Sequence, residues 1–111
     1  SAASDVYKRQ EKRIRGAAMA DFVICLYNPS SRKRADYLKK ACEYILEYQS
    51  PDTVCGYVRN IGREGEDAHI LTLSELKDTE VDMFTTVYIG NSQTRNVDGK
   101  MVTPRGYRLE E

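Results

Sequence analysis

The hydrophobic pattern of this chain changes between the period of a strand and the period of a helix. Four runs of strand length are apolar or β-branched: 22–27 (FVICLY), 54–60 (VCGYVRN), 68–73 and 85–89 (TTVYI). Apolar residues at helical spacing predict a short helix over 11–20 and a longer one over 35–46, which Ser30 and Ser31 could cap. Strands that alternate with helices in this way predict an α/β fold with a mixed sheet of about five strands.

Local sequence signals place the turns between these elements. Pro29 cannot donate a ladder hydrogen bond, so the first strand must end near it. A capping box at 72–75 predicts a short helix after the strand over 68–73. Gly62 and Gly65 bracket a charged turn, and the Asp-Gly pair at 98–99 predicts a terminal β-hairpin over 97–102.

Length and charge bound the function. A chain of 111 residues can build one core, so we expect one domain over 11–111, with 1–10 as a disordered leader or a non-native segment. Lys plus Arg number 17 and Asp plus Glu number 17, which argues against a nucleic acid or a membrane surface as partner. No apolar run is long enough to span a membrane, and we expect a cytoplasmic protein.

The residues with reactive side chains do not form a known motif. Three cysteines (Cys25, Cys42 and Cys55) without a CxxC pair predict reduced core thiols and neither a disulfide nor a bound metal. The single histidine, His69, alternates with leucines and has no partner at a motif spacing, so a packed or rim position is the better interpretation. Tyrosines at 37, 44 and 48 widen the apolar stripe of the longer helix, which predicts core or interface.

The segment 81–95 (VDMFTTVYIGNSQTR) is the strongest candidate for a site. Its strand stops at Gly90, and the polar residues 91–95 follow where open α/β sheets often bind ligands. A buried strand followed by an ordinary loop explains the same pattern equally well. The pattern alone therefore leaves both interpretations open.

Four separated motifs identify a resemblance that covers 11–107. They are LYNPSS at 26–31, VRNIGREGE at 58–66, VDMFTTVYIGNSQTR at 81–95 and MVTPRGY at 101–107. Together they resemble the precorrin-3B C(17)-methyltransferases of cobalamin biosynthesis, within the tetrapyrrole methyltransferase family. The resemblance implies a three-layer αβα domain, the second of two that hold S-adenosylmethionine (SAM) between them. The glycine-rich GxGxG loop of the first domain has no counterpart here.

The resemblance also implies site residues. Tyr27 and Asn28 would contact the methionine part of SAM, Arg59 and Asn60 would make a second contact, and the backbone at 84–86 (Phe84, Thr85 and Thr86) would hold the adenine side. Five residues would contact a precorrin substrate: Asn91, Ser92, Thr94, Arg95 and Arg105. A guanidinium can grip a carboxylate with two hydrogen bonds, although surface charge or a salt bridge explains both arginines equally well.

The implied reaction is SAM-dependent methylation of C-17 of precorrin-3B or cobalt-precorrin-3 with ring contraction. SAM would be the co-substrate, with no protein-bound metal, and no residue of this chain can be assigned as the catalytic acid or base. Because half of the cleft is absent, we expect the chain to be inactive without the missing N-terminal domain. The resemblance also implies a homodimer. The alternative is a non-enzymatic α/β module for small-ligand binding or oligomerisation, and an unrelated nucleotide-binding domain is disfavoured by the missing glycine fingerprint.

Overall fold

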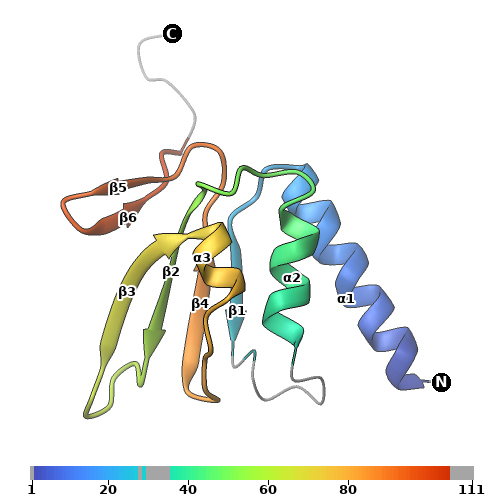
Figure 1. The fold of residues 1–111 in the computed structure, drawn as a ribbon, viewed down its shortest axis with the longest axis horizontal. Helices are drawn as coiled ribbons and strands as arrows, with labels where there is room; N and C mark the ends of the chain where they lie inside the picture. The colour runs from blue at the N-terminus through green and yellow to red at the C-terminus, as the bar shows by residue number, and fades with distance from the viewer. Residues whose placement is uncertain (1, 28, 30–35, 106–111) are drawn as a thin grey trace, which may run out of the picture.

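The computed structural model describes residues 2–27, 29 and 36–105 and has helices packed beside a sheet (Figure 1). The helices are α1 (Ala2–Met19), α2 (Tyr37–Ile45) and α3 (Leu73–Lys77). The sheet strands are β1 (Ile24–Tyr27), β2 (Val54–Arg59), β3 (Asp67–Thr72) and β4 (Thr85–Ile89). A separate hairpin is formed by β5 (Arg95–Val97) and β6 (Lys100–Val102).

The main sheet has four strands in the order β1-β4-β2-β3, and all three neighbouring pairs are antiparallel. The expected mixed sheet of about five strands is therefore wrong. The reason is that β4, the last of the four in sequence, inserts between β1 and β2, which run parallel to each other without touching. The hydrophobic pattern sets where a strand lies and says little about its neighbour.

The described helices pack on one face of the sheet. Side chains of β2 and β4 on that face, Cys55, Val87 and Ile89, are buried in one cluster with α1, α2 and α3. No helix among the described residues covers the other face, where Cys25 is exposed and a Cβ on Gly56 would lie 3.7 Å from the Met101 sulfur of β6. The expected third layer is thus replaced, in this part of the chain, by the β5–β6 hairpin.

The turns and caps that depend on neighbouring residues are confirmed. Thr72 and Glu75 form the predicted capping box of α3. Gly62 and Gly65 have φ values of 72° and 83°, in the region that glycine adopts freely. Positive φ at both Asp98 and Gly99 builds the tight primed turn of the hairpin.

Helix α1 begins at Ala2, so the described residues of 1–10, expected to be a disordered leader, continue the helix predicted over 11–20. Tyr7 and Gln10 line a small hollow against Tyr37 and Tyr44 of α2, which extends the contact between the two helices. The alternative, that 1–10 is a non-native segment, stays a prediction. Helix α2 begins at Tyr37, while the predicted caps Ser30 and Ser31 lie outside the described residues.

Two of the three cysteines lie in the core, as expected. Burial raises the pKa of the Cys42 thiol to about 12 and that of Cys55 to about 11. Cys25 is exposed, because it lies on the face of β1 that no described helix covers, and its predicted core position is wrong. None of the described helices has the length and apolar character needed to cross a membrane.

Candidate functional site

One edge of the sheet gathers the residues predicted to hold SAM. β1 and β2 end at this edge and β4 begins there, because Tyr27 pairs with Thr86 and Arg59 pairs with Thr85 in the antiparallel ladders. Six residues define this edge, which we call the rim: Tyr27, Arg59, Asn60, Phe84, Thr85 and Thr86. Asn28, the seventh predicted cofactor residue, lies outside the described residues.

The approach to β4 is fixed by Asp82, which sequence reasoning missed. One oxygen of its carboxylate accepts hydrogen bonds from the Phe84 amide (2.9 Å) and from the Thr85 hydroxyl (2.8 Å). The Thr85 hydroxyl also accepts from the Asp82 amide at 3.2 Å. These bonds lower the pKa of Asp82, first through Thr85 and then through the backbone. An Asp three residues before the β-branched run at 85–89 was the available signal, since Asp commonly bonds to the backbone two residues on, here at Phe84.

The turn between β2 and β3 completes the rim. Asn60 has a φ of 55°, and its amide donates to the Phe84 carbonyl at 3.0 Å. Its side chain donates to the Gly65 carbonyl at 3.3 Å, which holds the turn back against the strand end. Arg63 of this turn places its guanidinium 4.3 Å from the centre of the Phe84 ring. This cation–π contact joins the turn to the start of β4.

Large apolar side chains at the rim are left open. Tyr27 is 68% exposed and Phe84 47%, and the neighbouring Ile61 and Met83 are 48% and 55% exposed. Exposed apolar side chains gathered at one end of a sheet are candidates for contact with another molecule or domain. Thr86, the cross-strand partner of Tyr27, lies on the same sheet face and is buried. A hydrogen bond with Cys25 raises the pKa of Tyr27 above the ordinary value of a phenol.

Arg59 serves the fold at this edge. Its guanidinium donates to the Glu80 carbonyl at 3.1 Å and lies 5.0 Å from the centre of the Tyr57 ring. His69 stacks on the same ring at 4.9 Å and bonds to Asp67 at 2.7 Å, so the histidine packs at the sheet surface, in agreement with the predicted packed or peripheral position.

The residues predicted to contact the substrate lie elsewhere. Asn91, Ser92, Thr94 and Arg95 follow the C-terminal end of β4, whereas the rim lies at its N-terminal end (Figure 1). Arg105 is exposed and lies beyond β6. The sheet therefore separates the two predicted groups by the full length of β4. The polar side chains of 91–95 hydrogen-bond within the chain, above all to Asp21, which the sequence pattern did not single out.

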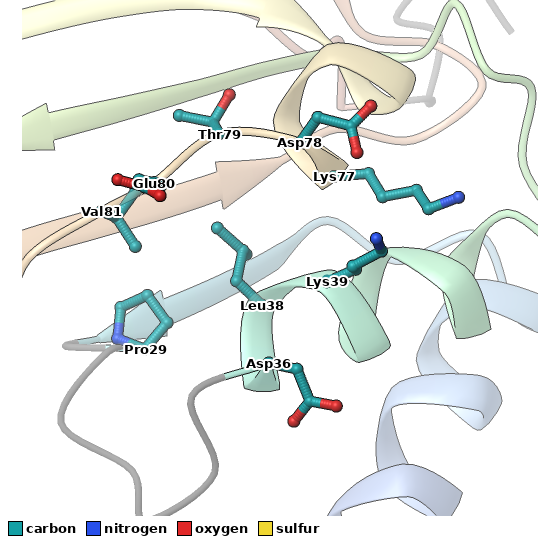
Figure 2. A pocket seen from close by; sticks show the side chains of 9 residues that line it. All are labelled: Pro29, Asp36, Leu38, Lys39, Lys77, Asp78, Thr79, Glu80 and Val81. Carbon is teal, nitrogen blue, oxygen red and sulfur yellow. The ribbon is translucent and has the colours of Figure 1, made fainter.

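A cavity of about 550 Å³ opens beside the rim between α2 and the segment that leads into β4. Figure 2 shows Pro29, Leu38 and Val81 on one side of this cavity and the side chains of Lys39 and Lys77 on the other. Its volume is in the range of small-molecule sites. None of the six rim residues lines it, although Pro29 follows β1 and Val81 precedes the Asp82 turn.

The rim provides part of what SAM requires. An adenine needs an apolar surface and a few directed hydrogen bonds. Exposed aromatic rings at the rim offer the apolar surface, whereas the Phe84 amide and carbonyl already bond to Asp82 and Asn60. A single edge cannot enclose a ligand, because pockets usually bury most of the ligand surface. Within residues 2–27, 29 and 36–105, no three His, Cys, Asp or Glu side chains gather in a way that could hold a metal ion.

Comparison with known proteins gives the relatives of this chain. No family model matches it. It is 50% identical over 97 residues to the cobalamin biosynthesis protein CbiHC of Archaeoglobus fulgidus, covering 87% of this chain and 21% of the relative. It is 44% identical over 99 residues to the "Probable cobalt-factor III C(17)-methyltransferase" of Salmonella typhimurium, covering 89% of this chain and 41% of the relative.

A solved structure agrees with these sequence relatives. The methyltransferase CobJ superposes with a TM-score of 0.74 at 29% identity, over 88% of this chain and 41% of the CobJ chain. The chain thus spans about two fifths or less of the relatives it matches.

Proposed function

We propose that this chain, a homologue of the cobalt-factor III C(17)-methyltransferases over most of its length, forms one wall of the SAM cleft in such an enzyme. The proposed reaction methylates C-17 of a precorrin-3B or cobalt-precorrin-3 macrocycle with ring contraction. The proposed wall is the rim. The remaining wall would come from a domain that carries the glycine-rich loop.

The observation that carries this proposal is the register of the sheet. Residues more than 50 positions apart, Tyr27 and Thr86, are cross-strand partners, and Asn60 bonds to Phe84 beside them. Three of the four motifs that carry the resemblance therefore meet at one edge, the third of them through residues 84–86 only, although the sheet differs from the expected one. Convergence of distant motifs is what a ligand site requires and what independent turn signals do not require.

Methyl transfer from SAM depends more on the positioning of the reactants than on acid or base groups. SAM supplies the methyl group on a sulfonium, and transfer to carbon requires an in-line arrangement of sulfur, methyl and the attacking carbon. In this proposal Phe84 gives the adenine side an apolar surface and Tyr27 contacts the methionine part, while Asp82 and Asn60 hold the chain segments that present Phe84. The described residues at the rim contain no histidine, and proton transfer in ring contraction is left to groups outside this wall.

The direct test is calorimetry with S-adenosylhomocysteine (SAH). We expect weak or no binding to this chain alone and stronger binding after addition of the N-terminal part of the Salmonella relative, because half of the cleft is then restored. Thr86→Val in the rim should weaken that binding, whereas the matched variant Thr94→Val at the other end of β4 should not. Turnover by this chain alone, or equal effects of the two variants, would contradict the proposal.

The second candidate is a non-enzymatic module, and the cavity in Figure 2 is the observation that favours it. In that case a small ligand would be retained by Leu38 and Val81 without any added domain. Leu38→Ala should then weaken ligand binding while Thr86→Val has no effect.

A homodimer is also proposed. The proposed interface uses the tyrosines of α2 and the segment after it: Tyr48 is 46% exposed, while Tyr37 and Tyr44 are half-buried. Sedimentation of Tyr48→Ser beside the parent chain tests this interface, because the variant should dimerise less.

A further inference from the structure

We propose that Asp21 is the anchor of a structural joint that holds the loop after β4, and with it the β5–β6 hairpin, against the body of the domain. The joint consists of six residues: Asp21, Gln49, Asn91, Ser92, Thr94 and Thr103. This inference concerns the polar residues that follow Gly90 and does not depend on the proposed methyltransferase function.

Asp21 connects three segments that are distant in sequence. Its Oδ1 accepts from the Ser92 amide and from the Gln49 side chain, both at 2.9 Å, and its Oδ2 accepts from the Ser92 hydroxyl. Its backbone carbonyl accepts from the Asn91 side chain at 3.0 Å. The end of α1, the segment after α2 and the loop after β4 thus meet at one residue.

The backbone at Asp21 is adapted to this role. Its φ is 62°, a conformation that Asp and Asn tolerate better than most residues with a side chain. The preceding helix ends with backbone bonds from Asp21 to the Ala18 carbonyl and from Phe22 to the Ala17 carbonyl. The chain therefore turns sharply after α1, and the carboxylate faces the loop rather than the solvent beyond the helix.

Within the loop, Thr94 connects Asn91 to the segment that follows the hairpin. Its hydroxyl accepts from the Asn91 amide at 2.9 Å and lies 2.7 Å from the hydroxyl of Thr103, which follows β6. Arg95 donates back to the carbonyls of Ser92 and Thr94, at 3.0 and 2.9 Å. Both ends of the hairpin are consequently tied to the same short loop.

The position of the hairpin has a consequence for the sheet. Met101 and Lys100 of β6 form one side of a cavity of about 430 Å³, and Val58, Ile70 and Tyr88 of the uncovered sheet face line the other side. A hairpin that swung away would expose this apolar surface to water. The geometry of the joint therefore assigns the polar residues of 91–94 to holding the hairpin, a task that occupies the groups a substrate would need.

Amide hydrogen exchange measured by NMR tests this proposal, with Asp21→Asn as the main variant. Asparagine tolerates the positive φ and keeps the size of the side chain, but it loses the charge and cannot accept from both donors of Ser92. We expect the Ser92 and Thr94 amides to exchange about tenfold faster or more, because hydrogen bonds to a charged group are the stronger ones. Amides of β2 and β3 should keep their rates.

Asp98→Asn is the matched control, because Asp98 also has a positive φ, of 51°, but lies exposed in the hairpin turn. It should leave the loop amides unchanged. Ser92→Ala, which removes one donor, should accelerate the Thr94 amide in the same direction by a smaller factor. Unchanged loop amides in Asp21→Asn, or acceleration spread equally over β2 and β3, would overturn the proposal.

Discussion

The two ends of β4 differ in how they use their polar and apolar groups. At the N-terminal end, the rim leaves Tyr27, Met83 and Phe84 largely exposed. At the C-terminal end, Asn91, Ser92 and Thr94 bond to one another and to Asp21, and Thr94 is 2% exposed. Polar residues after a strand thus mark the closed end of this sheet, and exposed aromatic residues mark the open end.

The antiparallel order explains why a rule made for parallel sheets points to different ends of this sheet for different strands. In parallel sheets the carboxyl ends of all strands lie at one edge, so a polar cluster after a strand points to that edge. Here β4 runs against β1 and β2, and its C-terminal end lies opposite theirs. Applied to β4, the rule therefore points to one end of the sheet, and applied to β1 and β2 it points to the other.

The largest expected effect is at Gly90, where β4 enters the joint. A Cβ there would lie 2.4 Å from the Val54 carbonyl oxygen and 2.6 Å from the Thr94 Cβ, both on packed elements. We expect Gly90→Ala to lower the free energy of unfolding by about 3 kcal/mol, measured by urea denaturation. Gly16→Ala in α1 is the control, since nothing lies within 4 Å of its Cβ position, and it should stabilise by roughly 0.5–1 kcal/mol. Equal effects would mean that Gly90 is not constrained.

The two buried threonines at the ends of β4 give a smaller and more direct comparison. Thr94→Val leaves the amide of half-buried Asn91 without its acceptor and should cost about 2 kcal/mol. Thr85→Val leaves only the exposed Asp82 without its partner and should cost about 1 kcal/mol, because Asp82 can bond to water instead. Thermal and urea unfolding of both variants measure the difference. The reverse order would contradict the view that the joint is the more closed end.

The features predicted from the sequence are those set by neighbouring residues. The box at Thr72 and Glu75 and the turn at Asp98 depend on side chains within four positions, and both are present. The insertion of β4 between β1 and β2 depends on contacts across the whole chain, and the pattern could not show it. The bond between Asp21 and Ser92 spans 71 positions and has no periodic signal. The resemblance named the rim residues as a hypothesis, but the sequence could not show that Tyr27 and Thr86 would be cross-strand partners.

Thiol reactivity separates the covered face of the sheet from the uncovered one. At pH 8 we expect iodoacetamide to modify Cys25 in the folded protein, while Cys42 and Cys55 react only after unfolding. The pKa values of about 12 and 11 keep the two buried thiols protonated at this pH, and burial also blocks access. Mass spectrometry of the modified protein, with and without urea, counts the labelled cysteines. Modification of Cys42 in the folded protein would show that α2 does not stay packed on the sheet.

The smallest effect on stability is expected at the rim itself. Tyr27 is 68% exposed, so Tyr27→Ala removes little buried surface and should change the free energy of unfolding by less than about 0.5 kcal/mol. In the presence of the N-terminal part of the Salmonella relative, the same variant should lose SAH affinity, because the amino-acid part of SAH loses its proposed contact with Tyr27. Tyr48→Ala, equally aromatic and also exposed, controls for a general effect of removing a surface ring. A residue whose loss harms binding and spares folding belongs to a site, whereas the residues around Gly90 should show the opposite pair of effects.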